Sequence, residues 1–168
     1  MAEVLKDYGY ATGAWGKWHN TPAEETTAAG PFENWPTGLG FEYFYGFLAG
    51  EASQYEPNLV RNTTYVLPSK TVEEGYHLSE DLADDAIGWL QRHKAFQRDK
   101  PFFMYWASGA IHGPFHIMKE WADKYKGKFD DGWDAYRERA FKRAKEKGWI
   151  PPDAQLTPRH ETMPSWDS

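Results

Sequence analysis

Hydrophobic side chains alternate or cluster in four short segments that we predict to be extended. Tyr10 to Lys17 is a short apolar run, and Phe41 to Phe47 alternates aromatic residues as a strand or a packed turn would. Asn58 to Val66 is polar at every second position, which favours a hairpin. Phe102 to Ala107 is continuously apolar, the pattern typical of a strand buried inside a parallel sheet. The chain should therefore contain a sheet.

Helical periodicity is clearest between Leu78 and Phe96, where apolar residues recur at steps of three and four. Ser79 is the candidate N-cap. The acidic residues that follow, including Asp84 and Asp85, place negative charge at the positive end of the helix. We interpret these two aspartates as charge near the helix terminus and not as metal ligands.

Further helices are predicted from Met1 to Tyr8, from Trp121 to Lys126 and from Asp131 to Lys147. The first resembles the last turns of an amphipathic helix, so we expect the natural amino terminus to lie upstream. Residues 20–40 are rich in Thr, Ala, Gly and Pro and predict a long loop, and residues 151–168 predict an irregular tail. A strand, a long connecting segment, a helix and a further strand follow one another along the chain. This order predicts an α/β fold with a crossover connection.

Composition narrows the classes of function. The chain has 168 residues, about one domain, and a net charge of −6, which argues against a nucleic-acid partner. No run approaches the roughly 18 apolar residues of a membrane helix, so we expect no membrane partner. Cysteine is absent, which excludes disulfides, thiolate metal sites and a cysteine nucleophile. The nine Trp, ten Tyr and ten Phe either pack against parts of a longer protein or line a cleft.

The first candidate site lies in the string Gly9-Tyr10-Ala11-Thr12-Gly13-Ala14-Trp15-Gly16-Lys17-Trp18-His19. Residues two apart in an extended segment share a face, so Lys17 and His19 should project together. Lysine can hold an anion as a point charge, and histidine can move a proton near neutral pH. This pair suits chemistry on sulfate or phosphate, although many such pairs lie on surfaces without a role. Trp15 and Trp18 either stack on an aryl substrate or belong to the core.

The second candidate site is Gly109-Ala110-Ile111-His112-Gly113-Pro114-Phe115-His116, just beyond the last predicted strand. Ligands of open α/β sheets bind beyond the carboxyl ends of strands. If the two strands are parallel in one sheet, Lys17, His19 and His112 share one edge. Taken alone, His112 could equally be a loop histidine bonded to a backbone carbonyl. A metal site on His112 and His116 would need a helix, which Pro114 disfavours.

The chain resembles the type I sulfatase family, and within it the bacterial arylsulfatases. The first string has the form Gly-Tyr-x-Thr-x-x-x-Gly-Lys-Trp-His, and His112-Gly113-Pro114 has the form His-x-Pro that follows a buried strand in these enzymes. Intervening stretches such as GFEYFYGF and GYHLSEDLADDAIGWL also look like arylsulfatase sequence, so the resemblance covers nearly the whole chain. It implies an incomplete alkaline-phosphatase-like sulfatase sandwich, with a mainly parallel sheet flanked by helices.

The resemblance also implies a chemistry and roles for three residues. Sulfatases attack sulfur with a formylglycine, made from the Cys or Ser of a Cys/Ser-x-Pro-x-Arg motif, and hold sulfate with calcium. By this resemblance, Lys17 contacts sulfate and formylglycine, and His19 drives sulfate elimination. His112 binds sulfate and helps to protonate the leaving oxygen. The implied substrate is a small sulfate ester, with an aryl ester as one option.

The chain departs from the family pattern in its nucleophile and metal ligands. It contains no Cys and no Ser-x-Pro-x-Arg, and no Asp-Asp pair follows its first predicted strand. We interpret Asp130-Asp131 as the start of a helix. We therefore expect residues 1–168 to be part of a sulfatase catalytic domain, without the formylglycine and without calcium ligands, and inactive alone.

Several alternatives stay open at this stage. One is a phosphate or phosphonate ester hydrolase of the same superfamily, and another is a non-catalytic module that binds an anion or a sulfated ligand. Bare strand edges would favour self-association of such a chain. Bacterial arylsulfatases occur both in the cytoplasm and in the periplasm or outside the cell, so the location stays open as well.

Overall fold

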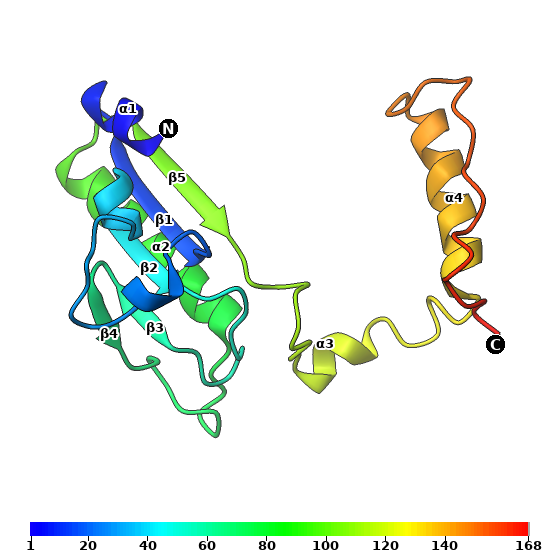
Figure 1. Ribbon diagram of the computed structural model, residues 1–168, viewed down its shortest axis with the longest axis horizontal. Helices are drawn as coiled ribbons and strands as arrows, with labels where there is room; N and C mark the ends of the chain where they lie inside the picture. The colour runs from blue at the N-terminus through cyan, green and yellow to red at the C-terminus, as the bar shows by residue number, and fades with distance from the viewer. Residues whose placement is uncertain (168) are drawn as a thin grey trace. The chain divides into compact units, whose positions relative to one another are not determined.

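The computed structural model describes residues 1–167 and divides the chain into two compact units, Met1–His116 and Ile117–Ser168 (Figure 1). The first unit holds the sheet and both predicted site motifs. The second holds two helices and the tail. The sequence predicts about one domain, whereas the structure has two units. All the predicted site residues lie in the first unit.

The first unit is built on a five-stranded mixed sheet in the order β4-β3-β2-β1-β5 (Figure 1). The strands are β1 (Ala11–Lys17), β2 (Tyr43–Phe47), β3 (Leu59–Arg61), β4 (Thr64–Val66) and β5 (Phe102–Ala107). Strand β1 runs parallel to β2 and to β5, whereas β3 and β4 form an antiparallel hairpin beside β2. The predicted strands, the hairpin and the parallel crossover are confirmed.

The register brings three strand ends to one edge of the sheet. Gly16 of β1 lies opposite Gly46 of β2 on one side and opposite Ala107 of β5 on the other. Gly16 has a φ of +97°, and a Cβ built there would lie 2.0 Å from the carbonyl oxygen of Ala107. Only glycine permits this close approach. The segments that follow β1, β2 and β5 therefore leave the sheet side by side.

Strand β5 differs from its prediction in burial. It pairs with β1 and forms one edge of the sheet. Its side chains Phe102, Tyr105 and Trp106 are each 40–44% exposed. The expectation of a buried strand is therefore wrong for this structure: Phe102 contacts Trp89 and His93 of α2, but within residues 1–167 no further strand pairs with the outer side of β5.

Two helices belong to the first unit. Helix α1 spans Ala2–Asp7, and helix α2 spans Leu78–Phe96, the predicted bounds. The N-cap of α2 is His77 and not Ser79 as predicted. His77 has an extended backbone, and its ring Nδ1 accepts a hydrogen bond from the backbone N–H of Ser79 at 3.3 Å. An imidazole nitrogen thus performs the role that we assigned to a hydroxyl.

Apolar side chains pack on both faces of the sheet. Helix α2 covers one face, over Trp15, Tyr45 and other buried residues. The other face carries Trp18, Phe44 and Val60 together with residues of α1 and of the loop 20–40, which includes two 3-10 turns, Ala23–Glu25 and Pro36–Leu39. Trp15 and Trp18 are 1% and 8% exposed. Of the two interpretations of these tryptophans, the structure supports core packing.

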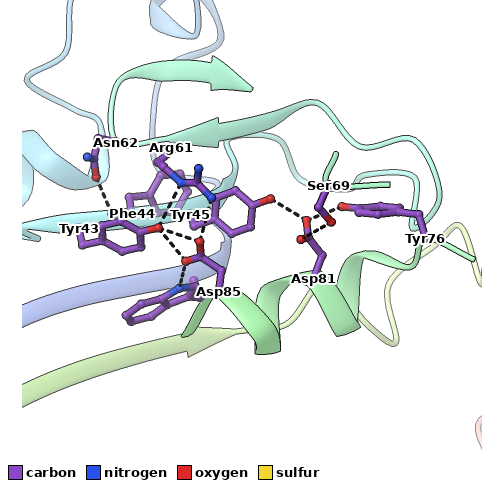
Figure 2. A network of polar contacts seen from close by, with 10 residues as sticks. Tyr43, Phe44, Tyr45, Arg61, Asn62, Ser69, Tyr76, Asp81 and Asp85 are labelled. Atoms are coloured by element: carbon purple, nitrogen blue, oxygen red, sulfur yellow. Dashed lines mark hydrogen bonds and ion pairs between the residues drawn. The ribbon is translucent and has the colours of Figure 1, made fainter. Parts of the chain in front are cut away.

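Asp85 joins α2 to the sheet through partly buried polar contacts (Figure 2). Its carboxylate accepts hydrogen bonds from Trp15 Nε1 at 2.9 Å and from the Tyr43 hydroxyl at 2.7 Å. It also pairs with Arg61 at 2.9 Å. The interpretation of Asp85 as charge near the helix terminus is therefore wrong. Asp85 lies in the third turn of α2 and faces the sheet.

Asp81 forms a second set of contacts one turn earlier in α2 (Figure 2). It accepts from the hydroxyls of Tyr45 at 2.6 Å, Tyr76 at 3.0 Å and Ser69 at 2.9 Å. Burial first, and the bonded carboxylate second, raise the pKa of Tyr45, while burial and the charge of Asp81 raise that of Tyr76. Burial and Asp85 likewise raise the pKa of Tyr43 to about 12.

The second unit contains helices α3 (Lys119–Asp123) and α4 (Gly132–Glu146). Asp131 is the N-cap residue of α4, which agrees with the predicted helix start. Its carboxylate pairs with Arg139. Residues 151–167 form neither helix nor strand, in line with the predicted tail, and they contact α4. For example, Arg137 donates to the Thr157 carbonyl, and the rings of Trp133 and Trp166 lie 4.8 Å apart. No helix within residues 1–167 combines the length and the apolar character needed to cross a bilayer.

Candidate active site at the strand ends

The parallel edge of the sheet positions both sequence motifs. Strand β1 ends at Lys17, which is half-buried, and Trp18 N–H continues the pairing by donating to the Phe47 carbonyl at 2.9 Å. His19 follows and is exposed. Strand β5 ends at Ala107, opposite Gly16, and the segment with His112 begins there. The structure thus places both motifs beyond neighbouring parallel strands, as the sequence predicts.

A cleft of about 670 Å³ lies at this edge. His19 from the first motif and Pro114 from the second both line it. The remaining lining mixes polar and apolar residues and comes from the loop 20–40, the end of β2, the segment after it and the hairpin: Thr21, Ala23, Thr26, Phe47, Leu48, Ala49, Glu51, Ala52, Ser53, Glu56, Asn58 and Tyr65. Lys17 and His112 are not among the lining residues, so the structure brings only part of the predicted set to the cleft.

His19 is packed against the backbone that follows β2. A Cβ built on Gly50 would lie 2.8 Å from His19 Cε1 and 3.1 Å from Nδ1. A residue with a side chain at position 50 would therefore displace the imidazole. The glycine allows the ring to lie against the main chain while it stays exposed to the cleft.

His112 lies on the surface with two polar neighbours. Its Nδ1 is 3.0 Å from the Gly113 carbonyl oxygen and 3.5 Å from Glu51 Oε2. Because a carbonyl only accepts, Nδ1 carries the proton, and Nε2 is the nitrogen left for a ligand. The ion pair with Glu51 is weak because both side chains are more than half exposed. His112 is thus a loop histidine bonded to a backbone carbonyl, one of the two interpretations from the sequence. Its other ring nitrogen, Nε2, can still bind a ligand.

Glu51 is the site residue that sequence analysis missed. It lines the cleft, and its Oε2 lies 3.5 Å from His112 Nδ1. It follows β2, whose carboxyl end lies at the same edge as those of β1 and β5. The rule that ligands bind beyond parallel strand ends could have indicated it, had β2 been assigned to the parallel part of the sheet.

The residues described by the structure do not fit a metal centre or a formylglycine. Within residues 1–167, no group of three or more His, Cys, Asp or Glu side chains is placed to hold a metal ion. The chain also has no cysteine to oxidise and no Ser-x-Pro-x-Arg. We therefore derive no chemical step that runs through calcium or formylglycine.

Comparison with known proteins places this geometry in context. The model of the sulfatase family matches residues 1–166. The chain belongs to the sulfatase family. Among sulfatases, the uncharacterized sulfatase YdeN of Escherichia coli is 35% identical in an alignment of 148 positions that covers 79% of this chain. An arylsulfatase of Klebsiella aerogenes is 28% identical over the full chain.

A solved structure shares the fold. The crystal structure of Ps i-CgsB in complex with k-i-k-neocarrahexaose superposes on 71% of this chain with a TM-score of 0.54 and 26% identity. The mixed sheet with its flanking helices therefore corresponds to part of an alkaline-phosphatase-like sulfatase fold. The chain spans 25% of the length of YdeN, 35% of the arylsulfatase and 28% of Ps i-CgsB. The activity of a whole enzyme is accordingly a matter of proposal.

Proposed function

We propose that this chain forms the sulfate-binding part of a sulfuric ester hydrolase that converts a small sulfate monoester to an alcohol or phenol and free sulfate. The observation that supports the proposal is the convergence of the two motifs. His19 and the segment around His112 come from distant parts of a sulfatase-family chain and meet beside one cleft.

Each of the three residues has a physical role in this proposal. Lys17 at the end of β1 supplies a fixed positive charge for the sulfate oxygens. His112 keeps its Nδ1 proton on the Gly113 carbonyl, and in its doubly protonated form it donates from Nε2–H to sulfate and then passes that proton to the leaving oxygen. His19 on the cleft wall accepts the proton whose removal lets sulfate depart. The attacking group and the calcium expected of the family would come from residues outside these 168.

Sulfate binding by the purified chain tests this proposal. We would titrate inorganic sulfate and follow the imidazole signals of His19 and His112 by NMR. The variant Lys17→Met keeps the apolar stem of the side chain but loses the charge, so we expect sulfate affinity to fall at least about tenfold. Lys70→Met, in an exposed loop ahead of α2, is the matched control and should leave affinity unchanged. Absence of sulfate binding by the wild-type chain would refute the proposal.

An aryl sulfate assay tests the accompanying expectation that the chain alone is inactive. Because no attacking group is present among these residues, product release should stay at the buffer rate. Activity that scales with chain concentration and disappears in His112→Ala would contradict this expectation.

A second candidate is a non-catalytic module that binds sulfate or a sulfated ligand. In such a module Lys17 and His112 would bind the anion in the same way, and His19 would have no chemical role. The two functions differ in their need for His19. His19→Ala should spare sulfate binding under both, but it should abolish turnover in an active longer protein. Competition between sulfate and phosphate in the same titration separates either candidate from a phosphate or phosphonate hydrolase.

A further inference from the structure

His77 is a buried histidine with a defined proton position. Its side chain caps α2, and the residue is 8% exposed. Nδ1 accepts from the backbone N–H of Ser79 at 3.3 Å. Because a backbone amide can only donate, Nδ1 carries no proton, and the neutral ring holds its proton on Nε2.

The protonated nitrogen of His77 faces the segment that carries His112. His77 Nε2 lies 3.3 Å from the carbonyl oxygen of His116, so the ring donates to that carbonyl. His116 closes the second motif, four residues after His112. One imidazole thus binds the start of α2 with one nitrogen and the end of the His112 segment with the other.

The segment after β2 fills the space between these two elements. The Gln54 carbonyl accepts from Leu78 N–H at 2.7 Å, and Gln54 N–H points to His116 Nδ1 at 3.4 Å. The Tyr55 ring stacks on His116 at 5.1 Å and meets His77 edge-on at 5.6 Å. The start of α2, the segment after β2 and the end of the His112 segment therefore form one contact cluster.

The His112 segment has little else to hold it. Ile111 adopts a φ of +69°, a left-handed conformation that is unfavourable for a β-branched residue. Its side chain is 94% exposed, so packing does not fix it. Such a conformation persists only where the surrounding structure enforces it. Within the described chain, Gly109 lies beside the Phe47 ring and His116 belongs to the cluster, and between these two ends lies the weak, exposed pair of His112 with Glu51.

We propose that His77 is a positioning residue: the hydrogen bond from its Nε2 to the His116 carbonyl holds the His112 segment in place beside the cleft. Its importance for sulfate rests on the proposed function, whereas its effect on the segment does not. His77 does not line the cleft and acts only through His116.

Two substitutions separate the two bonds of His77. Asn at position 77 can cap the helix as His77 Nδ1 does, but it is too short to reach His116. Gln is longer, so its amide nitrogen can take the place of Nε2 and donate to the His116 carbonyl. In the full chain, we would measure amide hydrogen exchange of residues 109–116 by mass spectrometry and the thermal midpoint by circular dichroism.

We expect His77→Asn to speed exchange in residues 109–116 by about threefold to tenfold, as the loss of one hydrogen bond implies, with little change in the thermal midpoint. His77→Gln should return exchange toward the wild-type rate. His93→Gln is the matched control, because His93 is also buried on α2 and binds a carbonyl, that of Lys100, at 2.8 Å. Unchanged exchange in His77→Asn, or equal exchange in the Asn and Gln variants, would overturn the proposal.

A second variant and a sulfate titration complete the test. Tyr55→Leu removes the ring that stacks on His116 but leaves the cap of α2 intact. We therefore expect faster exchange of residues 109–116 in this variant, even if the His77 variants fail to fold. Sulfate affinity should fall in His77→Asn and recover in His77→Gln. If the wild-type chain does not bind sulfate, the proposed function fails, while hydrogen exchange still decides the role of His77.

Discussion

Gly16 illustrates how one residue determines the geometry of the strand ends. It stands between two parallel neighbours, with a positive φ and no room for a Cβ beside the Ala107 carbonyl oxygen. Any larger residue would have to move either β5 or itself. The residue before Lys17 is therefore part of the site in a steric sense, although it carries no chemistry.

Replacing Gly16 with Ala should destabilise the first unit strongly. The added Cβ would lie 2.0 Å from the Ala107 carbonyl oxygen, in addition to the strain of a positive φ. We expect a loss in the free energy of unfolding of about 3 kcal/mol or more, measured by chemical denaturation. Gly9→Ala is the control, because Gly9 has a φ of +85° but no atom within 4 Å. It should cost about 1 kcal/mol, and equal losses in the two variants would contradict the steric explanation.

Single residues were predictable from sequence to different degrees. Lys17, His19 and His112 stand at strand ends, and this position can be inferred from apolar runs and their order. The cap at His77 could not be predicted, because imidazoles rarely cap helices and Ser79 offered the usual hydroxyl. The pairing of His112 with Glu51 depends on the path of two loops, which no periodicity describes.

At the scale of elements, α2 is joined to the sheet by polar contacts within an otherwise apolar interface. Asp81 and Asp85 each bind at least one tyrosine hydroxyl from the sheet (Figure 2). The helix could be predicted over its full length because its apolar spacing is regular. The contacts of Asp81 and Asp85 with the sheet could not be predicted. A carboxylate in a helix is ordinarily solvated, and the sheet partners of these two lie far away in the sequence.

These contacts predict instability in alkali. Folding raises the pKa of Tyr43 from about 10 to about 12, so the folded state holds this proton more tightly than the unfolded state does. The resulting stabilisation is complete below about pH 10 and is lost as the pH rises toward 12. Tyr43→Phe should reduce the loss of unfolding free energy over this range, as measured by urea denaturation at several pH values. Tyr8→Phe, at an 80% exposed position, is the control. An unchanged profile in Tyr43→Phe would contradict the assignment.

At the scale of the molecule, the sheet ends in a strand that is open along one side. Sequence predicted β5 as buried because a continuous apolar run is typical of a covered strand. Burial, however, depends on which other segments are present, and the pattern within a strand does not contain that information. Unpaired backbone groups and exposed aromatic side chains along β5 are the features through which chains pair edge to edge.

We propose that the isolated chain self-associates through β5. Its apparent mass, measured by light scattering after size-exclusion chromatography, should rise with concentration. Trp106→Lys places a charge on the exposed side of this edge strand and should reduce the association. Ile87→Lys changes an apolar residue on α2 that is also exposed, and it should have no effect. A monomer at all concentrations, or equal effects of both variants, would contradict edge pairing.

The pairing of β1 with β5 also determines when the site can form. Ala11 lies opposite Phe102, so the contact joins residues roughly 90 positions apart. Lys17 and His19 leave the ribosome before α2, whereas the strand that leads to His112 emerges only after the whole of α2. Domains whose key contacts span such distances close late in folding. The cleft beside these strand ends is therefore among the last features of the first unit to assemble during synthesis.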